Sequence, residues 1–428
     1  MEKHTVSQLK ALTSDTEVTL QGWIQDIRVM KNIIFLVFRD HTGIAQLTVK
    51  RDSWKGINLE SVSRESAVSA TGTFLAKGVS KIGPEILLKV LTVLNPSRSP
   101  LPLAVSDPVN SDIETRLNHR FLDLRKKEVN MVFQAQSKLL WGIRKFLSDN
   151  GFVEVHTPKV VAAATEGGAD LFRVQYFEKE TYLNQSPQLY KEILISAGLN
   201  RVFEVGPAFR AEKHNTVRHL NEFTSVDIEM AFSDHNDAMR MLEGSVRSGI
   251  SEVSSSMGKE LAETGHNILI PEIPFPRITY EESVKYIEGH GEKINFGDDF
   301  SPEQLKILGN QFHDFYFITK WPAVLRPFYT MPDPANSEFT NSFDLQYQEK
   351  EITSGAQRVH DPQMLVERFH SKGLREEDFS FYLESFMYGM PPHAGWGLGL
   401  ERLCMILLDL PNIREATLFP RDRNRISP

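Results

Sequence analysis

The chain has 428 residues, of which 41% are hydrophobic and 24% charged, as expected of a folded protein with two or more domains. A formal charge of −8 argues against a general nucleic-acid-binding protein, although local basic patches remain compatible with it. The single cysteine, Cys404, excludes an internal disulfide and a paired-cysteine metal site. The N-terminal segment lacks a signal-peptide core and no apolar run reaches the length of a membrane span, so we expect a cytoplasmic protein.

The first 98 residues contain five β-rich runs separated by Gly, Asp or Asn turn signals. These runs are VTLQGWIQDI, IIFLVFRD, IAQLTVK, SAVSATGTFL and EILLKVLTVL. Together with one longer crossing near residues 53–66, they predict a small Greek-key barrel of the OB type. The pattern alone leaves a generic β-domain as the alternative.

Prolines and short polar residues at 95–112 predict a linker, and we place a hinge at 99–128 between a domain at 1–98 and a larger one at 129–428. Helical periodicity then runs from Arg116 to Asn150 and stops at Gly151. Hairpin spacings dominate after that point, which favours an α+β domain built on an antiparallel sheet. We expect an insertion around residues 233–330 and assign it no chemistry.

A strand with one buried face is predicted at FTSVDIEMAF. The polar face carries Phe223, Ser225, Asp227 and Glu229. The apolar face carries Thr224, Val226, Ile228, Met230 and Phe232. Arg210 and Glu212 are two residues apart on the preceding strand, so we expect them to share a face. This surface suits a ligand with a phosphate, a flat ring and an amine, while a solvated sheet with cross-strand ion pairs is the alternative.

Two carboxylates flank a predicted hairpin turn at QEKE: Asp344 precedes it and Glu351 ends it. A hairpin brings such residues together, and Mg²⁺ prefers few carboxylates together with phosphate oxygens. Arg358 follows the flexible segment SGAQ. Alone, this pattern fits an ordinary charged surface hairpin equally well.

Three further segments carry patterns typical of binding sites. Gly395, Gly397 and Gly399 alternate before a helix that contains Arg402, so a flat group could approach the strand backbone. The spacing is neither a Walker A loop nor a dinucleotide-binding fingerprint. In QSPQLYK, Ser186 and Pro187 start a helix that bears Gln188 and Lys191. The Gly-Gly loop ATEGGAD carries Glu166.

Taken in chain order, GFVEVHTPKV, FRAE…RHLNEF and GLGLER resemble the three signature motifs of class II aminoacyl-tRNA synthetases. QSPQLYK, SGAQRVHD and PPHAG…GLGLER…LFPRD make the chain similar to aspartyl-tRNA synthetases of the archaeal and eukaryotic type. The resemblance covers nearly the whole chain. It implies in-line attack of the aspartate α-carboxylate on the α-phosphate of ATP, followed by transfer of the aspartyl group to the terminal ribose of tRNA.

The resemblance also implies roles for individual residues. Those implied to bind ATP are Arg210, Glu212, Arg218, His219, Leu220, Phe223, Glu351, Gly399, Glu401 and Arg402. Those implied to bind aspartate are Glu166, Gln185, Gln188, Lys191, Arg210, Asp227, Ser354 and Arg358. Magnesium would be held by Asp344, Glu351 and Ser354. The catalytic set is Arg210, Glu351 and Arg402.

Two cations, Lys191 and Arg358, favour aspartate over asparagine, because a neutral amide would leave buried charge uncompensated. Two rival functions remain. A binding module without catalysis should have lost residues such as Arg210, Asp344, Glu351 or Arg402, and all four are present. An amide-forming ligase that uses aspartyl adenylate without tRNA would resemble the catalytic domain alone.

In the N-terminal domain the resemblance implies that Phe35, Gln46 and Glu85 stack on or bond to anticodon bases, with Arg28 on the backbone. Core packing is the alternative for Phe35. Trp23 and Lys81 are more typical of enzymes that charge tRNA(Asp) alone than of those that also charge tRNA(Asn). Class II enzymes of this type are homodimers, and residues 116–158 match the interface motif.

Overall fold

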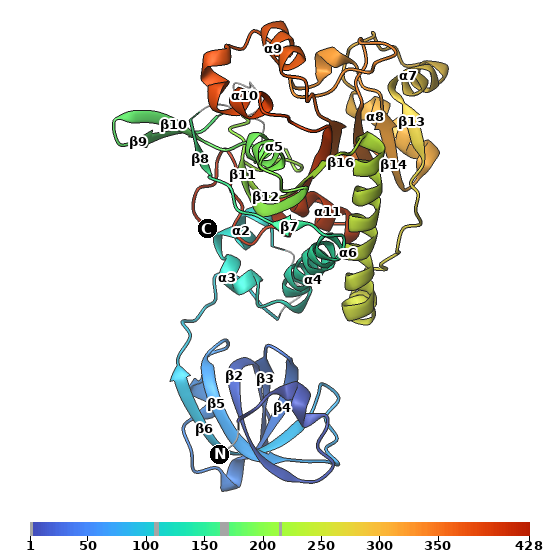
Figure 1. The fold of residues 1–428 in the computed structure, drawn as a ribbon. Helices are drawn as coiled ribbons and strands as arrows, with labels where there is room; N and C mark the ends of the chain where they lie inside the picture. The colour runs from blue at the N-terminus through green and yellow to red at the C-terminus, as the bar shows by residue number, and fades with distance from the viewer. Residues whose placement is uncertain (1–2, 107–110, 163–170, 214–215) are drawn as a thin grey trace. The chain divides into compact units, whose positions relative to one another are not determined.

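The computed structural model describes residues 3–106, 111–162, 171–213 and 216–428 (Figure 1). Two compact units, Met1–Lys126 and Lys127–Pro428, account for the chain. The predicted hinge at 99–128 therefore overlaps the end of the first unit. It contains two short helices, α2 (Ile113–Asn118) and α3 (Arg120–Asp123).

The first unit is a β-barrel in which β5 pairs with both β6 and β2 and so closes the sheet. Its strand order is β1-β2-β3-β4-β6-β5. The strands are β1 (Lys3–His4), β2 (Thr16–Val29), β3 (Ile33–Asp40), β4 (Gly43–Lys50), β5 (Ala67–Phe74) and β6 (Glu85–Asn95), with the helix α1 (Val6–Leu9) after β1. All five predicted runs form strands. Alternate residues such as Ile34, Leu36 and Phe38 fill the barrel, because period-2 side chains alternate between its two faces.

The second unit is built on an eight-stranded sheet in the order β13-β14-β15-β16-β17-β12-β11-β7. Pairing is antiparallel from β14 to β11, and only the edge strands β13 and β7 pair in parallel among the described strands of this sheet. Its strands are β7 (Val153–Glu154), β11 (Arg201–Phe209), β12 (Glu222–Ala231), β13 (Arg277–Thr279), β14 (Phe315–Thr319), β15 (Ser342–Tyr347), β16 (Lys350–Gln357) and β17 (His393–Gly399). A separate small sheet holds β8 (Val160–Val161), β10 (Lys179–Leu183) and β9 (Arg173–Tyr176). The α+β prediction is confirmed.

Helices cover the large sheet, and the main core lies between one of its faces and two long helices, α4 and α6 (Figure 1). The helices are α4 (Lys127–Asp149), α5 (Gln188–Ser196), α6 (His235–Glu263), α7 (Tyr280–Gly289), α8 (Pro302–Phe312), α9 (Pro362–Ser371), α10 (Ser380–Phe386) and α11 (Leu400–Leu407). From β12, the apolar positions Val226, Ile228 and Met230 join this core. The polar positions of the same strand are therefore left for the opposite face.

Two expectations need correction. Helical periodicity from Arg116 is not one helix, because α2 and α3 precede α4, although the chain does turn at Gly151 with φ of 79°. Phe232 is not a core residue: β12 ends one residue earlier, and Phe232 is 75% exposed with a positive φ. Within residues 233–330, the segment expected to be an insertion, α6 packs in the main core and β13 and β14 extend the sheet.

Candidate active site

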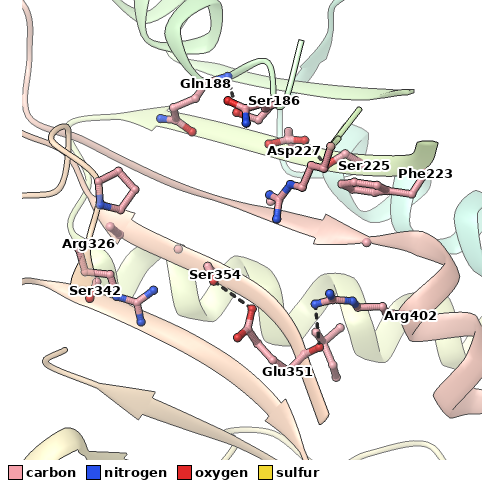
Figure 2. Close-up of a pocket in the computed structure, with 18 of the residues that line it drawn as sticks. Ser186, Gln188, Phe223, Ser225, Asp227, Arg326, Ser342, Glu351, Ser354 and Arg402 are labelled. Carbon is pink, nitrogen blue, oxygen red and sulfur yellow. Dashed lines mark hydrogen bonds between the residues drawn. The ribbon is translucent and has the colours of Figure 1, made fainter. Parts of the chain in front are cut away.

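A cavity of about 330 Å³ gathers most of the predicted site residues on the polar face of the large sheet (Figure 2). Its lining comes from β12, β16 and β17, from the segment after β11, and from residues 325–330. Predicted residues that line it are Gln185, Gln188, Arg210, Glu212, Arg218, His219, Leu220, Phe223, Asp227, Glu351, Ser354, Arg358, Gly399, Glu401 and Arg402. Lys191 and Asp344 lie buried behind the lining. Glu166 lies outside the described residues.

One end of the cavity is lined by an aromatic ring and two arginines. The Arg210 guanidinium carbon lies 5.6 Å from the centre of the Phe223 ring. Arg402, in the first turn of α11, donates a hydrogen bond of 3.3 Å from Nη1 to the Glu351 carbonyl oxygen. Figure 2 draws Phe223 and Arg402 toward the same side of the cavity. This nucleotide end can stack a flat ring and pair two guanidinium forks with phosphate oxygens.

Arg210 and Glu212 do not share a strand face, because β11 ends at Phe209. The side chain of Asn221 fixes the loop instead. Its Nδ2 donates to the carbonyl oxygens of Arg210, at 2.6 Å, and of Glu212, at 3.1 Å. The loop thus reaches the cavity through hydrogen bonds that a strand pattern does not reveal.

Around this loop lie the remaining residues implied to bind ATP. Arg218 is 3.7 Å from Glu349, on the hairpin turn after β15, and His219 is 3.9 Å from Glu212. Leu220 is buried in a small apolar cluster beneath Phe223. Both carboxylate oxygens of Glu401 accept a hydrogen bond from the backbone N–H of Thr224, at 3.0 and 3.1 Å, which fixes β12 to α11. Burial raises the pKa of this carboxyl group.

The opposite end of the cavity is formed by a cluster of buried charges on β12 and its neighbours. Lys191 donates from Nζ to Asp227 Oδ1 at 2.9 Å, and its nitrogen is 3.7 Å from Glu229 Oε2. Arg358 donates from Nε and Nη2 to the two oxygens of Glu229, at 3.0 and 3.3 Å. Burial alone would raise the pKa of Glu229, but the charges of Arg358 and Lys191 outweigh it and lower that pKa. Both predicted cations therefore already have carboxylate partners in this structure.

The glycines of β17 make room for these carboxylates. A Cβ atom on Gly397 would lie 2.9 Å from Asp227 Oδ1, and one on Gly395 would collide with the carbonyl oxygen of Ile228 and the carboxylate of Glu229. A Cβ on Gly399 would meet Arg402 at an ordinary 3.8 Å. At Gly395 and Gly397, acidic side chains of the neighbouring strand occupy the space that the glycine pattern predicted for a flat group.

The difference in space around Gly395 and Gly399 gives a stability prediction. Gly395→Ala should lower the free energy of unfolding by about 1–3 kcal/mol, because a rigid backbone carbonyl must move to admit the methyl group. Gly399→Ala is the matched control on the same strand and should change it by less than about 1 kcal/mol. Urea unfolding monitored by tryptophan fluorescence measures both, and equal effects would contradict this packing argument.

The candidate metal site contains two carboxylates. Asp344 and Ser354 are opposite each other on β15 and β16, and the Ser354 hydroxyl donates to Glu351 at 3.4 Å. Burial raises the pKa of Asp344 to about 6, with the nearby Glu351 adding to the effect and Arg326 opposing it. Among the described residues, Asp344 Oδ1 is buried without a hydrogen-bond partner.

The charge and donor set at this site fit a cation that takes its other ligands from phosphate oxygens and water. No group of three or more His, Cys, Asp and Glu side chains in the described parts of the chain is arranged to hold a metal by itself. Mg²⁺ bound together with a nucleotide usually takes one or two carboxylates from the protein. This site offers two, and one of their oxygens has no hydrogen-bond partner among the described residues.

Sequence reasoning missed several residues here. Arg326 donates from Nη2 to Asp344 at 2.6 Å, lies over the Trp321 ring at 4.5 Å and lines the cavity. It belongs to residues 233–330, to which the sequence patterns assign no chemistry. Glu192 and His393 are fully buried behind Arg358. The one available signal for Arg326 was a lone charge in the apolar run WPAVLRPFY.

The predicted anticodon residues share the outer face of the barrel sheet. Arg28 pairs with Phe35 across β2 and β3, and Gln46 pairs with Glu85 across β4 and β6. Phe35 is half-buried and lies outside the barrel core, which removes the core-packing alternative. The carboxylate of Glu85 accepts from the Thr48 hydroxyl at 2.7 Å and from the Val79 N–H at 3.0 Å.

Trp23 and Lys81 lie in different surroundings. Lys81 is exposed in the loop before β6. The Trp23 ring is flanked by the guanidinium groups of Arg39 and Arg125, at 5.9 and 5.3 Å, and both arginines bind Glu65. Its position is thus fixed by cation–π contacts within the first unit.

An antiparallel sheet with this arginine, phenylalanine and carboxylate arrangement, in a chain that begins with an OB barrel, has the plan of a class II aminoacyl-tRNA synthetase. The chain belongs to the family described as tRNA synthetases class II (D, K and N), which matches residues 112–423. Residues 18–94 match the OB-fold nucleic acid binding domain. The polar strand face and its neighbours are therefore the candidate active site of this ligase.

Curated relatives cover the whole chain. The aspartate–tRNA(Asp) ligase of Thermoplasma volcanium is 60% identical over 100% of both chains. The aspartate–tRNA(Asp/Asn) ligase of Archaeoglobus fulgidus is 48% identical over 96% of both. Among solved structures, asparaginyl-tRNA synthetase from Pyrococcus horikoshii, complexed with asparaginyl-adenylate, has a TM-score of 0.93 at 32% identity, with 100% of each chain covered. Aspartyl-tRNA synthetase from Entamoeba histolytica has a TM-score of 0.87 at 34% identity, covering 100% of this chain and 93% of that one.

Proposed function

We propose that this synthetase activates L-aspartate with ATP and transfers the aspartyl group to tRNA(Asp). The observation that carries the proposal is the buried guanidinium of Arg358 in the cavity wall, with the ammonium group of Lys191 behind it. Cations at the amino-acid end of the cavity favour a substrate with a carboxylate side chain, because an amide cannot compensate their charge. The names of the most similar curated relatives support the same substrate.

The reaction needs positioning and charge stabilisation, and no covalent intermediate on the enzyme. β12 runs through the cavity from Phe223 to Asp227, a span of about 13 Å at the usual rise of a strand. Adenine would stack between Phe223 and Arg402, and the substrate ammonium group would meet Asp227. Aspartate would then attack the α-phosphate in line, with Arg210 donating to the phosphate oxygens on which charge develops.

Asp344, Glu351 and Ser354 would hold a magnesium ion beside the phosphates. When bound, the ion would neutralise phosphate charge. The protein's own contribution at this point is to keep two carboxylates close together. Arg326 offsets part of their charge through its hydrogen bond to Asp344.

The proposed RNA-binding surface is the outer face of the barrel that carries Phe35, Gln46 and Glu85, with Arg28 beside them. We propose that Trp23 and Lys81 restrict charging to tRNA(Asp). A homodimer is proposed through residues 116–158, where Phe121 and Trp141 are 61% and 58% exposed. No helix in the described residues is long and apolar enough to cross a membrane. We expect the enzyme in the cytoplasm.

Aminoacylation with labelled aspartate, ATP and Mg²⁺ tests the function. We expect transfer to purified tRNA(Asp) and less than about one hundredth of that rate on tRNA(Asn), a ratio that corresponds to roughly 3 kcal/mol of discrimination. Labelled asparagine with either tRNA is the specificity control.

A second candidate function is charging of both tRNAs. It is favoured by the relatives whose names specify Asp/Asn, at 45–49% identity. Equal rates on the two tRNAs would establish it and would make Lys81 the first residue to substitute. Failure to charge either tRNA, while a reference synthetase is active, would overturn the proposed function itself.

A further inference from the structure

Six ionisable side chains form one enclosed cluster behind the amino-acid end of the cavity. Each is at most 4% exposed: Lys191, Glu192, Asp227, Glu229, Arg358 and His393. Gln188 connects the two halves of the cluster, because its Nε2 donates to Glu192 Oε1 at 2.8 Å and lies 3.4 Å from Glu229 Oε2. The charge state of Glu192 and His393 is therefore linked by contacts to the residues that meet the substrate.

The contacts of His393 define its protonation state. Its Nε2 lies 2.8 Å from Glu192 Oε2, and its Nδ1 lies 2.8 Å from the carbonyl oxygen of Pro391. A carbonyl oxygen can only accept, so Nδ1 carries a proton, and one further proton is held between Nε2 and the Glu192 oxygen. The hydroxyl of Tyr382 donates to the same Glu192 oxygen at 2.9 Å. Burial alone would lower the pKa of His393, but the hydrogen bond and the charge of Glu192 outweigh it and raise that pKa.

With His393 protonated, the charges of the cluster balance. Three cations, on Lys191, Arg358 and His393, face three carboxylates, on Glu192, Asp227 and Glu229. Removing the His393 proton leaves one uncompensated negative charge among side chains that are at most 4% exposed. Such a charge acts strongly on its neighbours, because the surroundings screen it weakly. It would oppose the entry of another carboxylate and leave an amide almost unaffected.

We infer that the proton held between His393 and Glu192 determines the preference for aspartate over asparagine. This proton completes the neutral cluster in which Arg358 and Lys191 accept a substrate carboxylate in preference to an amide. His393 is a positioning residue in this account: its backbone carbonyl accepts from the Arg358 N–H at 2.8 Å, and its ring lies behind the cavity wall. This inference rests on the proposed aspartate substrate. It adds that His393 and Glu192 set the net charge around the substrate side chain.

The charged and titratable groups around His393 come from four directions. Helix α5 supplies Glu192 and Lys191, and β12 supplies Glu229 and Asp227. Tyr382 approaches from α10, and the segment after β16 supplies Arg358 and His360. The pKa of Tyr382 is raised by burial and that of His360 is lowered by burial. Tyr382 and His360 are thus both neutral near pH 7, and His393 is the group of this set that loses charge as the pH rises.

The test uses aspartate-dependent exchange of pyrophosphate into ATP, with asparagine as a competing inhibitor. For His393→Gln, which removes the positive charge, the KM for aspartate should rise by about tenfold or more, while the KM for ATP stays within about twofold. In Glu192→Gln/His393→Gln one charge of each sign is absent, so the cluster is neutral again. This double variant should recover most of the affinity for aspartate.

If His393 had a purely structural role, the double variant would bind aspartate more weakly than His393→Gln, because it removes more of the native contacts. Tyr382→Phe is the matched control, since it removes one hydrogen bond to Glu192 without a change in charge, and it should keep the pH dependence of the wild type. From pH 6 to 9 the preference for aspartate over asparagine should fall in the wild type and stay level in the double variant. A level wild-type profile, or a double variant as weak as His393→Gln, would overturn the inference. Absence of aspartate-dependent exchange in the wild type would instead contradict the proposed function.

Discussion

Replacing Arg358 by glutamine should reduce kcat/KM for aspartate by about 10³-fold or more and lower the free energy of unfolding by about 3–5 kcal/mol. Both effects have one cause. Arg358 donates two hydrogen bonds to Glu229, which is fully buried, and it lines the cavity. Without the guanidinium, Glu229 loses the cation that binds both of its oxygens, and the substrate carboxylate loses its bidentate partner. Pyrophosphate exchange and urea unfolding measure the two effects separately.

The matched control for this substitution is Arg120→Gln. Arg120 is 1% exposed and donates to the buried carboxylate of Asp123 at 2.7 Å, a pair of the same kind in the first unit. Arg120→Gln should lower the free energy of unfolding and leave the KM for aspartate within about twofold, because it breaks a buried pair that does not line the cavity. If Arg358→Gln retained the wild-type KM for aspartate, Arg358 would be a structural residue alone and the aspartate assignment would lose its main support.

Much of the fold follows from patterns in the sequence. The five runs of the N-terminal domain formed strands, as their β-rich composition and the turn signals between them predicted. The alternation in β12 likewise separated the core positions Val226, Ile228 and Met230 from the polar positions around Asp227. The alternation gave a wrong prediction at the end of the strand. It placed Phe232 in the core, although β12 ends one residue earlier.

The partners of the site residues could not be read from the sequence. Lys191 and Asp227 were predicted as separate contacts for the substrate, and the structure pairs them at 2.9 Å. Glu192 and His393 are 201 residues apart, and Arg326 meets Asp344 only because β14 brings its segment to the sheet. Such pairs depend on which strands become neighbours. A single sequence indicates which residues could carry charge and leaves their pairing open.

The overall fold does not distinguish a synthetase for aspartate from one for asparagine either. A synthetase complexed with asparaginyl-adenylate has a TM-score of 0.93 to this chain, above the value of 0.87 for an aspartyl-tRNA synthetase. Amino-acid selection in such a fold must depend on a few side chains. In this chain we propose that they are the buried cations Lys191 and Arg358 and the carboxylates that orient them.

Arg210→Lys should slow adenylate formation by about 10²–10³-fold while changing the free energy of unfolding by less than about 1 kcal/mol. The Arg210 side chain lies 5.6 Å from the Phe223 ring at the nucleotide end, on a loop fixed by Asn221. Lysine keeps the charge and loses the planar fork, so it cannot donate two parallel hydrogen bonds to phosphate oxygens. The rate of a single turnover, measured by rapid quench with ATP and aspartate saturating, isolates this step from product release.

A loss confined to the single-turnover rate would assign Arg210 to the transition state, because interactions made equally with bound ATP would change its KM instead. Arg423→Lys is the control: this arginine donates to the carbonyl oxygen of Lys213, near the same loop, and is absent from the cavity lining of the described residues. It should form adenylate at the wild-type rate. If Arg210→Lys did so too, the fork geometry would be irrelevant, and a point charge near the phosphates would suffice for the chemistry proposed for this site.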